Sequence, residues 1–418
     1  MDILVNTIPK NARNREAANL GYEIVSKVSE ARRVNWWDNI EYNGIDEVGF
    51  NVFYPTHIFN AFAFMNKHNI PFEKTIWGGQ GVSNSKLDLN IYRGEMDSNY
   101  TDIKGWERCN KLISPPLIKH KYAVIELTRG CNHRCSFCEY GWVTGGSYRP
   151  KEIKLVTKQI DYCVHRGIFN INFLTTNFAG YPDIKELIHY CRMNNVNILN
   201  RDVYLQEIDK LWEWIEREKI HYLKIGVESF DEKTRISVGK KVTDDKLERI
   251  IDRLLKTSSS IHLYLIHGLP GDNYDEWFRW VKLLGDKRKS YTKMEKHLFG
   301  ERLVNTKNIR IEMSITNFEP CVGTPLENAK LVDFDVKDKF LKGWNKALSD
   351  AGFIRNKQEV TYATGRGRLG RKKLSYNMLM ALKQRPLKVD NIFNIFPKGI
   401  GRSISDEQAD KFLNKIGD

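Results

Sequence analysis

The chain has 418 residues, of which 41% are hydrophobic and 28% charged, and its formal net charge is +14. This is the composition of an ordinary globular protein, and the length suits about two or three domains with substantial cores. No run of about 18 apolar residues occurs, which excludes a membrane-spanning helix, and the first residues lack the apolar stretch of a secretion signal. We therefore expect a cytoplasmic protein with no membrane partner.

Residues 1–112 are predicted to form a small Rossmann-like domain. Strand-like runs lie at 2–6, 48–53 and 74–77, helical stretches lie near 16–33 and at 57–67, and a glycine-rich turn follows at 78–81. This alternation indicates a parallel α/β unit.

Residues 113–328 alternate strands and helices more regularly. Strands are expected at 122–127, 170–174, 196–199, 222–227, 261–267 and 309–317, and helices near 151–166, 183–193, 206–218, 244–256 and 275–284. Six βα-type units in series predict a parallel sheet curled into a partial (βα)6, TIM-like barrel. Ligands in such folds bind at the carboxyl ends of the strands.

Residues 329–418 are predicted to form a small basic C-terminal domain. Helices are expected at 336–351 and 374–383, and a capping box at 405–408 opens a last helix. Residues 354–402 contain twelve Lys and Arg and two acidic residues, which gives this segment a net charge of +10. Such a block favours a polyanionic partner, DNA or RNA first, and the alternative is a basic face that only aids solubility.

The most informative feature is a triplet of cysteines, Cys131, Cys135 and Cys138, directly after the first barrel strand. Three thiolates do not complete a tetrahedral zinc site, whereas in a cubane 4Fe–4S cluster they leave one iron free to bind a small molecule. A zinc knuckle would need His133 as fourth ligand, but His133 lies inside the triplet, where the loop is too short for it to turn inward. The seven cysteines of the chain do not resemble a disulfide framework.

The spacing Cys-x3-Cys-x2-Cys, with Phe137 before the last cysteine, resembles the radical S-adenosylmethionine (SAM) superfamily, and within it the cobalamin-domain and methylthiotransferase-like branches. The resemblance implies that the free iron binds SAM, which is cleaved to a 5′-deoxyadenosyl radical that abstracts hydrogen from a substrate. It also implies reduction by flavodoxin or ferredoxin.

Four later segments of the barrel fit the same resemblance. It places Asn177 in the loop that binds the SAM amino group, although acidic residues or Gly-Gly-Glu are usual there. It makes Gly226 and Glu228 contacts of the nucleoside, and Lys240 a counter-charge for the SAM carboxylate. Gly268, in a Gly-Leu-Pro-Gly turn, would let the backbone lie against the adenine, and residues 317–326 resemble the loop that closes the barrel.

The remaining residues narrow the reaction. The resemblance implies that methylthiotransferases bind a second cluster through three further cysteines before the triplet. Only Cys109 precedes the triplet here, so a single cluster is expected. Cys321 and Tyr140 are candidates for returning a hydrogen atom to the substrate, although ordinary packing explains both. The cobalamin pattern Asp-x-His-x-x-Gly is incomplete around His57, because Pro55 and Asn60 replace Asp and Gly. We therefore expect a degenerate domain without cobalamin.

The sequence thus predicts a radical SAM enzyme acting on a base or modified base in nucleic acid, by rearrangement or hypermodification. Whether it is an isomerase, lyase or transferase stays open, as does the oligomeric state. One alternative keeps the chemistry and takes a small metabolite or peptide as substrate. Another is a non-catalytic iron–sulfur protein that binds nucleic acid or senses redox state.

Overall fold

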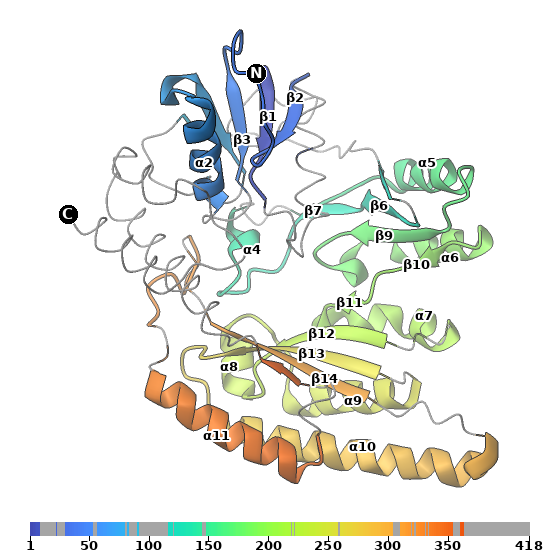
Figure 1. Cartoon of the computed structure of the whole chain (residues 1–418). Coiled ribbons are helices and arrows are strands. Elements are labelled where there is room, and N and C mark those ends of the chain that lie inside the picture. Colours follow the sequence, from blue (N-terminus) through green and yellow to red (C-terminus); the bar gives the residue numbers. More distant parts are fainter. Residues whose placement is uncertain are drawn as a thin grey trace.

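The structure is a computed structural model, whose described residues form two parallel β-sheets, one mixed β-sheet and a two-stranded antiparallel hairpin (Figure 1). It describes residues 1–8, 22, 30–52, 57–79, 82, 90–91, 116–119, 121–143, 148–218, 220, 222–257, 260–303, 310–318, 320–321, 323–330, 332, 334–353 and 360–362. Most of the basic block at 354–402, with the helices expected at 374–383 and after 405, lies outside these residues.

The N-terminal sheet has the order β2-β1-β3-β4, all parallel. Its strands are β1 (Ile3–Asn6), β2 (Arg32–Asn35), β3 (Val48–Asn51) and β4 (Thr75–Gly78). Helix α2 (Ile58–His68) and the short η2 (Phe72–Lys74) connect β3 to β4. The core contains aliphatic and aromatic side chains, and Phe50 stacks on Trp77. The expected parallel α/β arrangement is present, but residues 32–35 are a strand and not the end of a helix.

The first barrel sheet has the order β10-β9-β6-β5, and only β5 is antiparallel. Its strands are β5 (Leu117–Ile118), β6 (Ala123–Glu126), β9 (Asn170–Leu174) and β10 (Asn197–Ile198). Helices α5 (Ile153–Val164) and α6 (Ile184–Met193), with the turn η4 (Phe178–Gly180), connect them. The hairpin β7 (Thr128–Gly130) and β8 (Tyr148–Pro150), with α4 (Glu139–Val143) between them, follows β6.

The second barrel sheet is wholly parallel, in the order β11-β12-β13-β14-β15. Its strands are β11 (Asp202–Val203), β12 (Tyr222–Glu228), β13 (Ser260–His267), β14 (Arg310–Asn317) and β15 (Val360–Tyr362). The connecting helices are η5 (Leu205–Leu211), α7 (Trp212–Arg217), α8 (Glu232–Ser237), α9 (Asp244–Thr257), α10 (Tyr274–Leu303) and α11 (Phe334–Asp350).

One extended segment joins the two barrel sheets. Residues 197–199 bond to β9, and only a few residues later Arg201 O accepts from Lys224 N of β12 at 2.7 Å. The strand expected at 196–199 is thus observed as β10, and β11 is an additional short strand that begins the second barrel sheet. The predicted α/β fold with a TIM-like core is confirmed.

The barrel core lies between the sheets and their helices. Strands β12, β13 and β14 alternate a fully buried residue with a half-buried one, so one face packs against helices while the other faces the barrel interior. Helix α10 is longer than the expected 275–284, and it lies beside α11 (Figure 1). Trp277 of α10 packs edge-on against Phe340 and Trp344 of α11.

Helix α11 and strand β15 thus share the core and sheet of the barrel. The division of the chain at residues 112 and 328 stays a prediction. No helix in the described part of the chain has both the length and the apolar character needed to cross a bilayer.

Candidate functional site

The cysteine loop begins at the carboxyl end of the first barrel strand. Strand β6 ends at Glu126, and the chain then forms β7 before reaching Cys131. Thr176, which follows β9, donates its hydroxyl to Gly130 O at 2.9 Å and so ties the loop to the neighbouring strand end. The loop therefore lies on the rim where ligands of parallel α/β folds bind.

Each of the three sulfur atoms has a polar hydrogen nearby. The amide of His133 contacts Cys131 Sγ at 3.4 Å, and the hydroxyl of Tyr204 lies 3.4 Å from Cys135 Sγ. The amides of Tyr140 and the following residue hydrogen-bond to Cys138 and oppose the rise in its pKa. Donors of this kind stabilise thiolates, the form in which cysteine binds metal.

Burial is the largest influence on two of these thiols. It raises the pKa of Cys135 and of Cys138, and each is affected by the charges of its partners in the triplet. A buried group of neighbouring thiols is unfavourable as bare anions, so a cation is needed to hold them ionised. The donor set thus fits an iron–sulfur cluster. Among the described residues, no three His, Cys, Asp or Glu side chains are arranged to hold a single metal ion.

Two glycines let the backbone close around the loop. A Cβ on Gly141 would lie 2.6 Å from His133 O, and a Cβ on Gly239, which has φ +93°, would lie 3.3 Å from Cys135 Cα. Ser136 N donates to Val238 O at 3.1 Å. The segment after α8 is therefore a wall of the cysteine loop, and neither glycine was singled out from the sequence.

The His133 side chain is engaged by Glu207 and Tyr204 and is not placed as a metal ligand. Its Nε2 lies 2.9 Å from Glu207 Oε1, and its ring stacks on Tyr204 with centroids 3.7 Å apart. Burial lowers the pKa of His133, and Glu207 partly offsets this. A zinc site with His133 as ligand does not fit this arrangement.

Asn177 is 2% exposed and already has partners. Its Oδ1 accepts from Gly180 N at 3.1 Å, and its Nδ2 lies 2.9 Å from Glu207 Oε1 and 3.0 Å from His133 Nε2. The amide therefore connects the loop after β9 to the cysteine loop. Its contact with SAM stays a prediction.

Glu228 and Lys240 form an ion pair, with 3.0 Å between Oε1 and Nζ, and both side chains are largely buried. Glu228 has φ +67°, and the β12–β13 register shifts between Gly226 and Glu228. A Cβ on Gly226 would lie 2.5 Å from Glu228 Oε1 and 3.1 Å from Lys240 Nζ. The three residues singled out from the sequence thus meet at one point on the rim.

The other predicted site residues lie around this rim. Phe137 packs against an apolar group of Val238, Leu269 and Phe318. Gly268 has φ +89°, and a Cβ there would lie 2.5 Å from Val332, so Val332 lies over this turn.

The two candidate hydrogen donors are also near strand ends. The hydroxyl of Tyr140 accepts from Gly130 N at 3.3 Å. Cys321 follows β14 and is half-buried, and its carbonyl accepts from the Thr324 hydroxyl at 2.8 Å. Their roles stay predictions.

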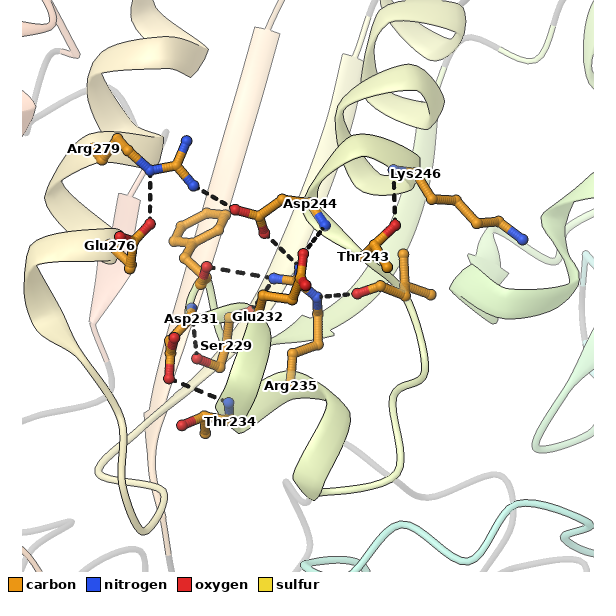
Figure 2. A network of polar contacts seen from close by, with 12 residues as sticks. Ser229, Asp231, Glu232, Thr234, Arg235, Thr243, Asp244, Lys246, Glu276 and Arg279 are labelled. Atoms are coloured by element: carbon orange, nitrogen blue, oxygen red, sulfur yellow. Dashed lines mark hydrogen bonds and ion pairs between the residues drawn. The ribbon is translucent and has the colours of Figure 1, made fainter.

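The buried side chain of Arg235 lies in a network of polar contacts around α8 (Figure 2). Arg235 is fully buried, and it donates to Val242 O at 2.8 Å, to Ser229 O at 3.0 Å and to Asp244 Oδ1 at 2.6 Å. Asp244 also pairs with Arg279 of α10. The guanidinium of Arg235 thus connects the loop before α8 to the loop after it.

Tyr204 and Glu207 were not predicted from the sequence as residues of the site. Both follow β11, the short strand that was not predicted, and Tyr204 caps η5. Residues just after a barrel strand lie on the rim. Recognising residues 202–203 as a strand would therefore have pointed to both.

Comparison with known families decides the nature of this rim. Residues 125–284 match the Radical SAM superfamily, and the match includes the cysteine loop and the ends of β9, β12 and β13. The chain contains a radical SAM domain. The predicted resemblance is confirmed.

Among curated relatives, the ribosomal protein uS12 methylthiotransferase RimO of Acetivibrio thermocellus is 24% identical over 186 residues, which are 41% of this chain and 40% of that protein. The RimO of Sulfurihydrogenibium sp. is 26% identical over 190 residues, 42% of this chain and 43% of that protein. The chain thus spans less than half the length of these relatives.

A solved structure extends the likeness to the whole chain. The radical SAM methyltransferase TsrM from Kitasatospora setae, with cobalamin and a [4Fe-4S] cluster bound, matches with a TM-score of 0.56. It covers 100% of this chain and 99% of TsrM at 10% identity. At this identity, the likeness concerns the fold alone.

Proposed function

We propose that this protein is a radical SAM enzyme whose cluster is held by Cys131, Cys135 and Cys138. The observation that carries the proposal is that three neighbouring thiols lie on the barrel rim, each with an N–H or O–H group at its sulfur. Three protein ligands leave one iron of a 4Fe–4S cluster for SAM. With both groups bound, this chemistry supplies a 5′-deoxyadenosyl radical that abstracts hydrogen from the substrate.

The residues of the rim supply the binding groups for SAM. Lys240 offers a cation to its carboxylate, and Glu228 offers acceptors to its hydroxyl or amino groups. Gly226 and Gly268, at the ends of β12 and β13, let the Glu228–Lys240 pair and Val332 respectively approach the backbone closely. Asn177 fixes the position of the cysteine loop through the contact of its Nδ2 with His133.

The proposal is tested by incubating anaerobically reconstituted, dithionite-reduced protein with SAM. Formation of 5′-deoxyadenosine and methionine is expected. A protein that binds iron but does not cleave SAM would favour the non-catalytic, redox-sensing alternative.

For the substrate, we propose a base or modified base in nucleic acid. The support is the charge of the chain, +14 in total, with +10 in residues 354–402. Each phosphate contact would make binding depend on salt. Filter binding of RNA and DNA at increasing salt tests this, with Arg371→Glu, Lys372→Glu and Lys373→Glu combined as the variant. Affinity that is independent of salt and of these charges would contradict it.

A polypeptide substrate is the second candidate, because the curated relatives are named for a ribosomal protein. A basic face would also suit a protein bound within RNA. Stimulation of 5′-deoxyadenosine formation by a peptide, compared with an oligonucleotide, separates the two. Methylthio transfer is not proposed, because this sequence has only Cys109 before the triplet.

We further propose that the N-terminal sheet works without cobalamin, although TsrM was solved with cobalamin bound. His57 is only 6% exposed, and burial lowers its pKa to about 4. Asn60 is fully buried, and its Nδ2 donates to Thr7 O at 2.7 Å. A corrin spectrum retained after desalting with hydroxocobalamin would overturn this. Flavodoxin or ferredoxin is the proposed reductant, and the reducing cytoplasm the proposed compartment.

A further inference from the structure

The side chain of Tyr204 occupies a position that no motif predicts. Tyr204 lies directly after β11 and directly before η5, and the buried residues Leu205, Ile208 and Leu211 anchor that helical turn. Gln206 adds a tie to the wall of the cysteine loop, since its Nε2 donates to Gly239 O at 3.3 Å. The backbone of Tyr204 is therefore fixed relative to the loop.

The ring of Tyr204 is held on both faces. The His133 ring stacks on it with centroids 3.7 Å apart and planes 10° apart. The Lys240 ammonium lies over the ring, 4.2 Å from its centroid. Because the imidazole already covers one face at stacking distance, the ammonium lies on the other face, where a cation–π contact is favourable. The hydroxyl therefore has little freedom to turn away from Cys135.

The direction of the hydrogen bond follows from the chemistry. The hydroxyl oxygen lies 3.4 Å from Cys135 Sγ, and in a free thiol either atom could donate. A cysteine that binds iron is a thiolate and carries no proton. Only the tyrosine hydroxyl can then donate. Cys135 is 6% exposed, so no bulk water replaces this donor.

We propose that Tyr204 donates a hydrogen bond to the Cys135 thiolate and thereby raises the reduction potential of the cluster. The proposal rests on the proposed function, because it requires a cluster on Cys135. Reduction adds one electron to the cluster, and no proton transfer is needed. The added negative charge spreads onto the thiolates, so a donor to sulfur stabilises the reduced state more than the oxidised state. Tyr204 is a positioning and tuning residue, not a catalytic one.

The first test is Tyr204→Phe, which keeps the stacked ring and removes the hydroxyl. The midpoint potential, measured by EPR-monitored redox titration of the reconstituted protein, should fall. A hydrogen bond to a charged group changes the reduction equilibrium about tenfold, which for one electron is about 59 mV. Tyr181→Phe is the control, because Tyr181 is 1% exposed and its hydroxyl donates to Lys151 O at 2.7 Å. Its potential should equal that of the unmodified protein.

A second variant separates tuning from structural damage. Tyr204→3-fluorotyrosine keeps the shape and carries a stronger O–H donor, so its potential should rise while that of Tyr204→Phe falls. Opposite shifts support the proposal, and a Tyr204→Phe variant that loses its cluster leaves the fluorinated variant to decide. Potentials that stay equal, or shifts in the same direction, overturn it while the proposed function stands. An unmodified protein that assembles no 4Fe–4S cluster overturns both.

Discussion

The ammonium of Lys240 lies 3.0 Å from Oε1 of Glu228, and this pair closes over Gly226 at the end of β12. This ion pair explains why a glycine stands near the carboxyl end of β12, a position where a side chain would normally contribute to packing. It also places the two charges proposed to meet SAM beside the cysteine loop. The rim is thus built from contacts between residues about 100 positions apart, such as Ser136 and Val238.

Gly226→Ala should weaken SAM binding about tenfold. This is roughly the change in affinity that the loss of one hydrogen bond to a charged group causes. The added Cβ would lie 2.5 Å from Glu228 Oε1, so the ion pair must move. Equilibrium dialysis of SAM checks this. Gly78→Ala is the control, since nothing lies within 4 Å of a Cβ there. Unchanged binding in Gly226→Ala would remove Glu228 and Lys240 from the SAM site.

Replacing any one of Cys131, Cys135 or Cys138 by Ala should reduce the iron bound after reconstitution to background. Each thiolate is a proposed ligand, and a cluster with two ligands is not retained. Iron and sulfide analysis measures this.

The matched controls are Cys163→Ala and Cys191→Ala, buried in α5 and α6. These variants should lose some thermal stability but keep their iron. Iron loss in the controls equal to that in the triplet variants would show that folding, not ligation, was measured.

Arg235→Met should lower the free energy of unfolding by about 3–5 kcal/mol, because it leaves the carbonyls of Val242 and Ser229 without this donor and removes one of the two arginines that pair with Asp244. The guanidinium is fully buried and bonds to Val242 O, Ser229 O and Asp244. Urea unfolding gives the value. Lys246→Met, which removes the exposed pair with Asp209, should change it by less than about 1 kcal/mol. Similar losses in both variants would refute the buried clamp.

Asp272 makes stability depend on pH in an unusual direction. Burial raises the pKa of its carboxyl from 3.8 to about 7, although Ser229 and Trp277 donate to Oδ1. Among the described residues, Oδ2 has no hydrogen-bond partner. The folded state thus favours the protonated acid. Its contribution to stability is complete below pH 3.8 and is lost as the pH rises through about 7.

Asp272→Asn keeps the Oδ1 acceptor and cannot ionise. At pH 8 the variant should melt a few degrees above the unmodified protein. This shift in Tm corresponds to a gain of roughly 1–2 kcal/mol in the free energy of unfolding for a chain of this size. At pH 4 the two should melt together. Melting curves between pH 4 and 8 decide, and parallel curves would show that Asp272 is ionised in the fold.

Much of the fold could be predicted because the barrel strands are apolar runs bounded by polar turns. Strand β9 was predicted with its observed bounds, and α6 and α9 within one residue. Strand β11 was missed because two residues with an exposed Asp202 carry no periodic signal. The range expected to be helical near 16–33 overlaps β2, since Arg32–Asn35 pairs with β1 and tertiary pairing overrides local propensity.

The site was only partly predictable. The cysteines, Glu228 and Lys240 belong to motifs and could be found by spacing. Tyr204 could not, because its role depends on a ring stacked on His133 and a hydroxyl near Cys135, and both contacts join residues about 70 positions apart. Contacts of this kind are set by packing and leave no local pattern.

The most direct test of the central claim is the EPR spectrum of the reduced protein with and without SAM. Anaerobically reconstituted protein should show a 4Fe–4S signal that changes when SAM is added, and it should then form 5′-deoxyadenosine. Protein that contains zinc, or a cluster whose spectrum is the same with and without SAM, would contradict the account.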